Sequence, residues 1–165
     1  MPKTRNISFS YTEYTSADEM APSDRELVVS SREIAMNAYA PYSNFKVGSA
    51  VRLQSGRVVT GTNVENAAFP SGICAERTAL SNAISNFPGD RPVAIAVSAV
   101  TPSGPTGDQV SPCGLCRQFI AEEELRNGKK IRIILSGKDK ILVIDSISDL
   151  LPLQFNKDDL RTVLP

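Results

Sequence analysis

The stretch VAIAVSAV, residues 93–100, is the most apolar run of the chain and indicates its fold class. A strand with one face in water alternates apolar and polar residues, whereas this run is apolar almost throughout. Such a run is typical of a strand that is covered on both faces, and it is far too short to cross a bilayer as a helix. We therefore expect residues 93–100 to lie inside a sheet that carries helices on both sides.

Patterns typical of helices and strands surround this run on both sides. Two runs suited to strands, residues 47–53 and 57–64, are separated by QSG, in which Gly56 supplies the backbone angle that a hairpin turn needs. The predicted order is helix 23–39, strands 47–53 and 57–64, helix 74–86, strand 93–100, helix 113–127, strands 131–135 and 141–145, and a short helix at 146–152. This order predicts an α/β fold, a three-layer α/β/α sandwich with a mixed sheet of about five strands.

The N-terminal residues differ in character from the rest of the chain. Residues 1–22 are polar and rich in hydroxyl groups and show no periodicity, so we expect a flexible arm there. Ser23 is followed three positions later by Glu26, a spacing that predicts the capped start of the first helix. Residues 23–165 are then expected to form a single domain.

Composition and charge exclude several classes of protein. The chain has 165 residues, of which 41% are hydrophobic and 22% charged, as in an ordinary domain with a sizeable core. Lys+Arg and Asp+Glu both total 18, so no net charge draws it to nucleic acid or to a membrane surface. The N-terminus lacks the apolar segment of a secretory signal, and three cysteines do not form an even disulfide set. We therefore expect a reducing compartment, the cytoplasm, with the nucleus left open.

Three cysteines and no histidine limit the metal or redox chemistry that the chain can carry out. A redox pair at Cys113 and Cys116 would leave Cys74 unexplained. An iron–sulfur cluster usually takes four thiolates, and a structural zinc site takes four protein ligands. Three thiolates with one free position fit a catalytic zinc, which keeps that position for water. Ordinary buried cysteines are the alternative, and we consider this the weaker interpretation of the CxxC pair.

The placement of the cysteines supports the zinc interpretation. Cys113 and Cys116 lie one turn apart at the start of one predicted helix, and Cys74 lies at the start of another. The helix dipole favours the thiolate form at such positions. Glu76, two residues after Cys74, is placed to take a proton from water at the metal and to pass it on.

Three thiolates around Zn²⁺ carry a net negative charge, which nearby cations would have to offset. Arg77 and Arg117 each follow a cysteine closely in the sequence. We expect Arg77 to donate hydrogen bonds to the sulfurs and interpret Arg117 as a solvated surface charge.

The CAE element at residues 74–76, followed by PCGLC at 112–116, resembles the zinc deaminases, in which a metal ligand-x-Glu element precedes Pro-Cys-x-x-Cys. Further segments narrow the resemblance to the cytidine deaminases, specifically the short, homotetrameric type with three cysteine ligands. The matching segments are YAPYSNFKVGSAV (39–51), GTNVENAAF (61–69), GICAERTAL (72–80), SPCGLCRQFI (111–120) and, more weakly, LLPLQF (150–155).

The resemblance implies a role for each matching residue. Cys74, Cys113 and Cys116 would ligate zinc, and Glu76 would shuttle protons. Phe45 would stack near the pyrimidine, Asn63 and Glu65 would hold the ribose hydroxyls, the backbone of Ala75 would receive the amide edge of the base, and Phe155 would reach into the site of a neighbouring subunit. Ala67 and Phe69 would also be contributed across the interface, and Phe69 stands where family members often carry tyrosine.

The function that the resemblance implies is hydrolytic deamination of cytidine and 2′-deoxycytidine to uridine and 2′-deoxyuridine plus ammonia, a reaction of pyrimidine salvage. Zinc-bound hydroxide would attack C4 of the base while Glu76 protonates N3 and then the departing amine. The expected protein is a homotetramer with one zinc per chain and shared active sites; its partner is a nucleoside, with no nucleic acid and no membrane.

Two alternatives remain open from the sequence. Blasticidin-type deaminases share SPCGxCRQ but match the NVEN and YSNF segments less well. A non-catalytic zinc-binding interaction module would have all four zinc positions filled by protein groups and would be indifferent to the loss of Glu76.

Overall fold

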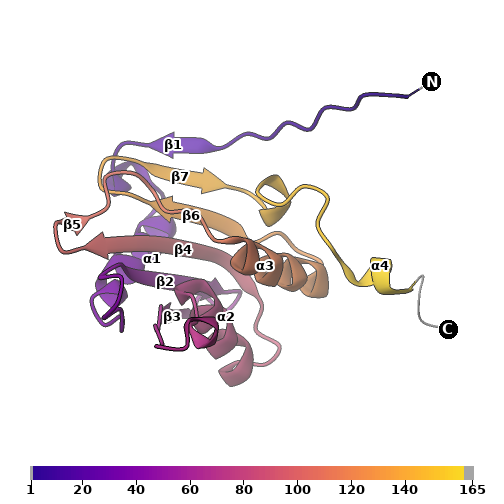
Figure 1. The fold of residues 1–165 in the computed structure, drawn as a ribbon. Coiled ribbons are helices and arrows are strands. Elements are labelled where there is room, and N and C mark those ends of the chain that lie inside the picture. The colour runs from indigo at the N-terminus through magenta and orange to yellow at the C-terminus, as the bar shows by residue number, and fades with distance from the viewer. Residues whose placement is uncertain (1, 162–165) are drawn as a thin grey trace.

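A mixed sheet forms the middle layer of the computed structural model, which describes residues 2–161 (Figure 1). Seven strands make up this sheet within the described residues, in the order β1-β7-β6-β4-β2-β3, with β5 paired to β4. β4 and β6 are parallel, and the other neighbours are antiparallel. The strands are β1 (Thr12–Tyr14), β2 (Lys46–Leu53), β3 (Val58–Thr62), β4 (Pro92–Thr101), β5 (Gly104–Pro105), β6 (Arg132–Ser136) and β7 (Ile141–Ile144).

Helices cover both faces of the sheet, as the sequence predicts. In Figure 1, α2 and α3 lie in front of the sheet and α1 lies behind it. The helices are α1 (Pro22–Ala35), α2 (Ala75–Asn86), α3 (Gly114–Asn127) and α4 (Lys157–Arg161), with short 3-10 turns at Ala17–Glu19, Phe69–Ser71 and Ile147–Asp149. The three-layer α/β/α fold is therefore confirmed. None of the helices within residues 2–161 combines the length and the apolar character needed to span a membrane.

The central position of β4 is confirmed, because this strand is paired with β2 on one side and β6 on the other. Its side chains alternate between two cores. Ile95 and Val97 pack in the core that α2 and α3 cover, and the smaller Ala94 and Ala96 pack in the core that α1 covers. A strand buried in this way needs apolar residues at successive positions, which explains the unbroken run in the sequence.

Two glycines allow helices to approach the sheet closely. A Cβ on Gly48 of β2 would lie 2.1 Å from the carbonyl oxygen of Ser31 in α1. A Cβ on Gly61 of β3 would lie 2.4 Å from the backbone nitrogen of Ala79 in α2. Neither distance is possible for a real side chain, so both helices depend on the missing Cβ for their position.

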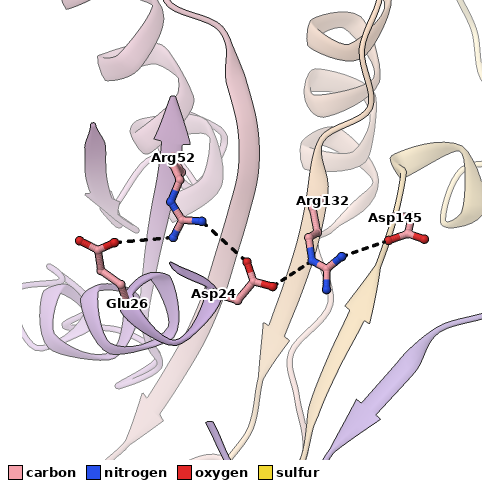
Figure 2. Close-up of polar contacts among 5 residues, drawn as sticks. All are labelled: Asp24, Glu26, Arg52, Arg132 and Asp145. Carbon is pink, nitrogen blue, oxygen red and sulfur yellow. Dashed lines mark hydrogen bonds and ion pairs between the residues drawn. The ribbon is translucent and has the colours of Figure 1, made fainter. Parts of the chain in front are cut away.

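A chain of charged side chains fixes the first turn of α1 to the sheet (Figure 2). Asp24 is buried and lies between two arginines, with Arg132 Nε at 3.0 Å and Arg52 Nη1 at 3.7 Å from its carboxylate. Arg52 also contacts Glu26, and Arg132 also contacts Asp145. One buried carboxylate thus holds together α1, β2 and β6.

The structure corrects the expected number of strands from about five to seven. The additional strands are β1, which pairs with β7, and β5, which has only two residues. Both are too short to show an alternating pattern, so neither could be predicted from the sequence. Because of β1, regular structure begins at Thr12, inside the segment expected to be a flexible arm, and Met20 is buried in the core beside α1.

Both ends of α1 differ from the sequence prediction. The helix begins at Pro22 with Ala21 as its cap, and no side chain caps it, so the predicted Ser23 cap is wrong. Proline fits the first helical position because its φ is fixed near the helical value and an N–H there has no partner within the helix. The helix ends at Ala35, before Tyr39, whose carbonyl oxygen accepts a hydrogen bond from Glu65 N at 2.8 Å.

Candidate metal centre and substrate pocket

Three cysteine sulfurs come together where α2 and α3 begin. Cys74 is the N-cap residue of α2, and Cys113 is the N-cap residue of α3. Cys116 lies one turn inside α3 and is fully buried. Cys74 Sγ is 3.7 Å from Cys113 Sγ, which is 3.5 Å from Cys116 Sγ, and all three atoms lie within 4.8 Å of one another.

This triangle of sulfurs fits a zinc ion. A tetrahedral ion with Zn–S bonds of about 2.3 Å places its sulfurs about 3.8 Å apart. The observed spacings are close to that value and far longer than a disulfide bond, and all three cysteines are free. No histidine or carboxylate joins the cluster among the described residues. The donor set among the described residues therefore consists of three thiols, one fewer than the four ligands of a tetrahedral ion.

The cluster favours one thiolate strongly. Hydrogen bonding from Cys116 is the main cause that lowers the pKa of Cys74 to about 5, with further contributions from Cys113 and from Arg77. The same hydrogen bond, together with burial, raises the pKa of the Cys116 thiol. A second ionised sulfur next to the first is therefore costly unless a cation compensates, as a divalent metal does.

Glu76 lies beside the sulfurs in the first turn of α2. Its side chain is 4% exposed, and its carboxyl group lines the same cavity as Cys74 and Cys113. Burial raises the pKa of Glu76, and the negative charge on Cys74 acts in the same direction. A buried carboxyl group beside three sulfurs that could hold a metal is placed to take up and release a proton in the cavity.

The two arginines near the cysteines differ in their contacts. Arg77 lowers the pKa of Cys74 through a hydrogen bond and through its charge, and its Nη2 donates to the carbonyl oxygen of Gly72 at 3.4 Å. Its buried Nε has no hydrogen-bond partner within the described residues. Arg117 instead donates to the carbonyl oxygens of Pro112 at 2.9 Å and Leu150 at 2.7 Å. It ties the start of α3 to the chain after β7, which is a structural role that the sequence did not indicate.

A cavity of 710 Å³ opens from the sulfurs to the surface, and most of the predicted substrate residues line it. They are Phe45, Asn63, Glu65 and Ala75, together with Phe69 of the same chain. Phe155 and Ala67 do not belong to its lining. Phe155 is 58% exposed, and its carbonyl oxygen accepts a hydrogen bond from Gln118 Nε2 at 2.9 Å.

The end of β3 places these residues next to the cysteines. Val64 forms an isolated antiparallel bridge with Ile73, so the loop after β3 returns to the sheet just before Cys74. Asn63 Oδ1 accepts a hydrogen bond from Val47 N at 2.7 Å, and Asn63 Nδ2 donates to the carbonyl oxygen of Phe45 at 2.9 Å. Asn63 thus joins the start of β2 to the end of β3, and its second amide hydrogen has no hydrogen-bond partner among the described residues.

Ser43 is a lining residue that sequence reasoning did not single out, although it lies within the YSNF segment. Its hydroxyl donates to Glu65 Oε1, and the backbone nitrogens of Tyr42 and Ser43 donate to Glu65 Oε2 at 2.9 and 3.3 Å. The carboxylate at the cavity wall is therefore held from the neighbouring turn.

Comparison with known proteins shows the family to which the chain belongs. Residues 22–128 match the family model described as the cytidine and deoxycytidylate deaminase zinc-binding region. The match covers more than half of the chain and includes the three cysteines and Glu76. The chain therefore belongs to this family.

Similar proteins within the family are cytidine deaminases. The cytidine deaminase of Sporosarcina psychrophila is 40% identical over 136 residues, which cover 82% of this chain and 93% of that protein. The cytidine deaminase of Halalkalibacterium halodurans is 38% identical over 139 residues, covering 84% and 98%. The crystal structure of cytidine deaminase from Burkholderia pseudomallei superimposes with a TM-score of 0.68 at 37% identity, covering 82% of this chain and 100% of that one.

Proposed function

We propose that this protein catalyses the hydrolytic deamination of cytidine and 2′-deoxycytidine to uridine and 2′-deoxyuridine, releasing ammonia. One observation carries the proposal: three sulfurs are spaced for zinc, and two of the cysteines that bear them, Cys74 and Cys113, line the same 710 Å³ cavity as the buried Glu76. The family to which the chain belongs and the cytidine deaminases that it resembles support the choice of nucleoside.

The proposed metal ligands are Cys74, Cys113 and Cys116. A zinc ion held by these residues would activate a water molecule for attack on the base. The chain supplies the positive ends of two helix dipoles and the Arg77 guanidinium to stabilise the thiolates around the metal.

Glu76 is the proposed proton carrier. Deamination replaces the amino group at C4 by oxygen, so one proton of water has to reach N3 and another has to reach the departing amine. The Glu76 carboxylate lies in the first turn of α2 at the buried end of the cavity and can carry both protons in succession. The reaction then consumes one cytidine and one water molecule and yields one uridine and one ammonia.

The remaining lining residues are proposed to bind the nucleoside. The ring of Phe45 offers an apolar face to the flat pyrimidine. The Glu65 carboxylate and the free amide hydrogen of Asn63 are suited to the sugar hydroxyls. The backbone of Ala75, at the start of α2, is proposed to receive the amide edge of the base.

We propose a homotetramer with shared active sites, because apolar side chains are exposed around the cavity. Phe69 and Leu115 line the cavity and are 75% and 68% exposed, and Phe155 is also exposed. Exposed apolar groups at the mouth of a pocket are typical of a surface that another chain covers. We propose that Phe155 of each chain completes the cavity of a neighbouring copy and that Ala67 lies at the same contact. We also propose that the enzyme works in pyrimidine salvage in the cytoplasm.

The direct test is to mix the zinc-loaded protein with cytidine and to follow the ultraviolet absorbance together with ammonia release. Conversion to uridine, with one ammonia per uridine, is the expected result, and protein treated with a chelator is the control. Cytidine left intact by protein that contains zinc would refute the proposal. Light scattering on the same sample tests the tetramer independently.

A further inference from the structure

One network of hydrogen bonds joins three residues that we propose as nucleoside contacts. Phe45 immediately precedes β2, and Asn63 and Glu65 follow β3. Asn63 binds the backbone of Phe45, whose nitrogen donates to Ser43 Oγ at 3.0 Å. Ser43 Oγ in turn donates to Glu65 Oε1. The Ser43 hydroxyl is therefore hydrogen-bonded to both Phe45 and Glu65.

The turn that carries Ser43 has the geometry that this double contact requires. Asn44 has a φ of 55°, in the left-handed region, and its backbone nitrogen donates to the carbonyl oxygen of Ala40 at 3.0 Å. Asparagine tolerates this region better than other residues with a side chain. The reversal at Asn44 directs the nitrogen of Phe45 back to the Ser43 hydroxyl, while the nitrogens of Tyr42 and Ser43 face the Glu65 carboxylate.

The Ser43 hydroxyl acts on Glu65 in two ways. Its hydrogen bond is the main cause that holds the pKa of Glu65 below the usual value of 4.5, so the carboxylate is ionised and accepts hydrogen bonds only. It also occupies one side of Oε1 and thereby fixes the direction of the remaining lone pairs. A sugar hydroxyl that meets an oriented carboxylate loses less entropy than one that meets a mobile carboxylate.

We propose that Ser43 is a positioning residue for the sugar: it orients the Glu65 carboxylate toward the nucleoside hydroxyls. This inference rests on the proposed cytidine deaminase function and adds to it a residue that acts through Glu65. Its effect is therefore confined to substrates whose sugar carries the hydroxyls that Glu65 binds.

The chain offers a matched control. Ser55, in the turn between β2 and β3, makes the same kind of contact with Asp90: its hydroxyl donates to Asp90 Oδ2 at 2.5 Å and its nitrogen donates to Asp90 Oδ1 at 3.0 Å. Neither Ser55 nor Asp90 lines the 710 Å³ cavity. Ser55→Ala removes a serine–carboxylate hydrogen bond without touching the site.

The test compares cytidine with 2′,3′-dideoxycytidine, which lacks the 2′- and 3′-hydroxyls and keeps the 5′-hydroxyl. For Ser43→Ala we expect KM for cytidine to rise about tenfold with little change in kcat, the factor that corresponds to one hydrogen bond to a charged group. The kcat/KM for dideoxycytidine should be unchanged, and Ser55→Ala should leave both substrates unaffected. Ser43→Thr keeps a hydroxyl and should restore the KM for cytidine, whereas Ser43→Val, matched to threonine in shape, should not.

A loss of the same size on both substrates, a loss carried by kcat, or equal KM values for Ser43→Thr and Ser43→Val would overturn the proposal. If Ser43→Ala does not fold, as judged from its zinc content and thermal unfolding, the Thr and Val variants decide the question. Failure of the proposed function itself is recognised separately, because the unmodified enzyme would then convert neither substrate.

Discussion

Cys74 and Cys113 occupy equivalent positions in the fold: each is the residue that caps the N-terminus of a helix, and their sulfurs lie 3.7 Å apart. Neither side chain caps its own helix by hydrogen bonding. The positive dipole ends of α2 and α3 therefore meet at one cluster of sulfurs. The cluster thus joins two helices that are far apart in the sequence.

Removal of the metal should consequently destabilise the whole fold. Zinc present at 100 times its Kd would contribute about 2.7 kcal/mol to the free energy of unfolding, and a chelator would remove this contribution. Thermal unfolding with and without chelator measures the effect, and zinc analysis should give one ion per chain. Cys113→Ala should bind less zinc and respond less to the chelator. Identical unfolding midpoints with and without chelator would contradict a bound metal that links α2 to α3.

Glu76→Gln should keep the metal and lose turnover. The substitution preserves the size of the side chain but removes the proton carrier, and general acid–base groups typically contribute a factor of about 10² to 10⁴ to the rate. We expect a decrease in kcat for cytidine of at least about a hundredfold with unchanged zinc content. Glu122→Gln, at an exposed position of α3, is the control and should behave as the unmodified enzyme does. Near-native turnover of Glu76→Gln would show that another group moves the protons.

The sequence predicted the features that repeat along an element or that depend on residue type. The apolar run of β4, the helical segments before and after it, and the Gly56 turn all lie where the patterns place them; Gly56 has a φ of 91°. The three cysteines and Glu76 were recognisable because their chemistry is distinctive and their spacing follows from helix starts.

Features that depend on contacts between distant residues could not be predicted in this way. Strand β1 exists because Thr12–Tyr14 pairs with β7 more than a hundred residues later, and its sequence alone has no strand pattern. The contact of Ser43 with Glu65 likewise joins two loops that meet only in the folded chain. The prediction of a Ser23 cap rested on a local pattern alone. The helix begins one residue earlier, at Pro22, because proline is suited to the first helical position.

Gly61→Ala should displace α2 and impair both stability and activity. The added Cβ would lie 2.4 Å from the backbone nitrogen of Ala79, and backbone atoms cannot move aside as a side chain can. Overpacking of this kind costs about 1–3 kcal/mol. Because α2 carries Cys74 and Glu76 at its start, kcat for cytidine should fall as well.

Urea denaturation and cytidine assays measure the two effects of Gly61→Ala. Thr60→Ala, at the neighbouring position that faces away from α2 in the strand alternation, should cost at most about 1 kcal/mol. A Gly61→Ala protein as stable as Thr60→Ala would mean that α2 does not depend on this close approach.

Asp24→Ala should destabilise the protein without affecting the cavity. The substitution leaves Arg52, whose side chain is 13% exposed, without its buried partner, and it also removes the contact of Arg132 (Figure 2). Loss of one partner from a buried ion pair costs about 3–5 kcal/mol, and we expect about 2–4 kcal/mol here because Arg132 is partly solvated. Glu26→Ala removes an exposed partner of Arg52 and should cost no more than about 1 kcal/mol.

Urea denaturation of the two variants tests this expectation. The kcat of folded Asp24→Ala should match that of the unmodified enzyme, because α1 covers the face of the sheet opposite to α2 and α3, whose first residues carry the cysteines. Equal losses of stability for Asp24→Ala and Glu26→Ala would show that the buried carboxylate has no special role.

X-ray absorption spectroscopy at the zinc edge examines the metal site of the intact enzyme in solution. The account predicts one zinc per chain, surrounded by three sulfur atoms and one lighter atom, with that lighter neighbour altered when a nucleoside inhibitor binds in the cavity. A fourth protein ligand on the metal, or a sulfur shell that includes a disulfide, would contradict it.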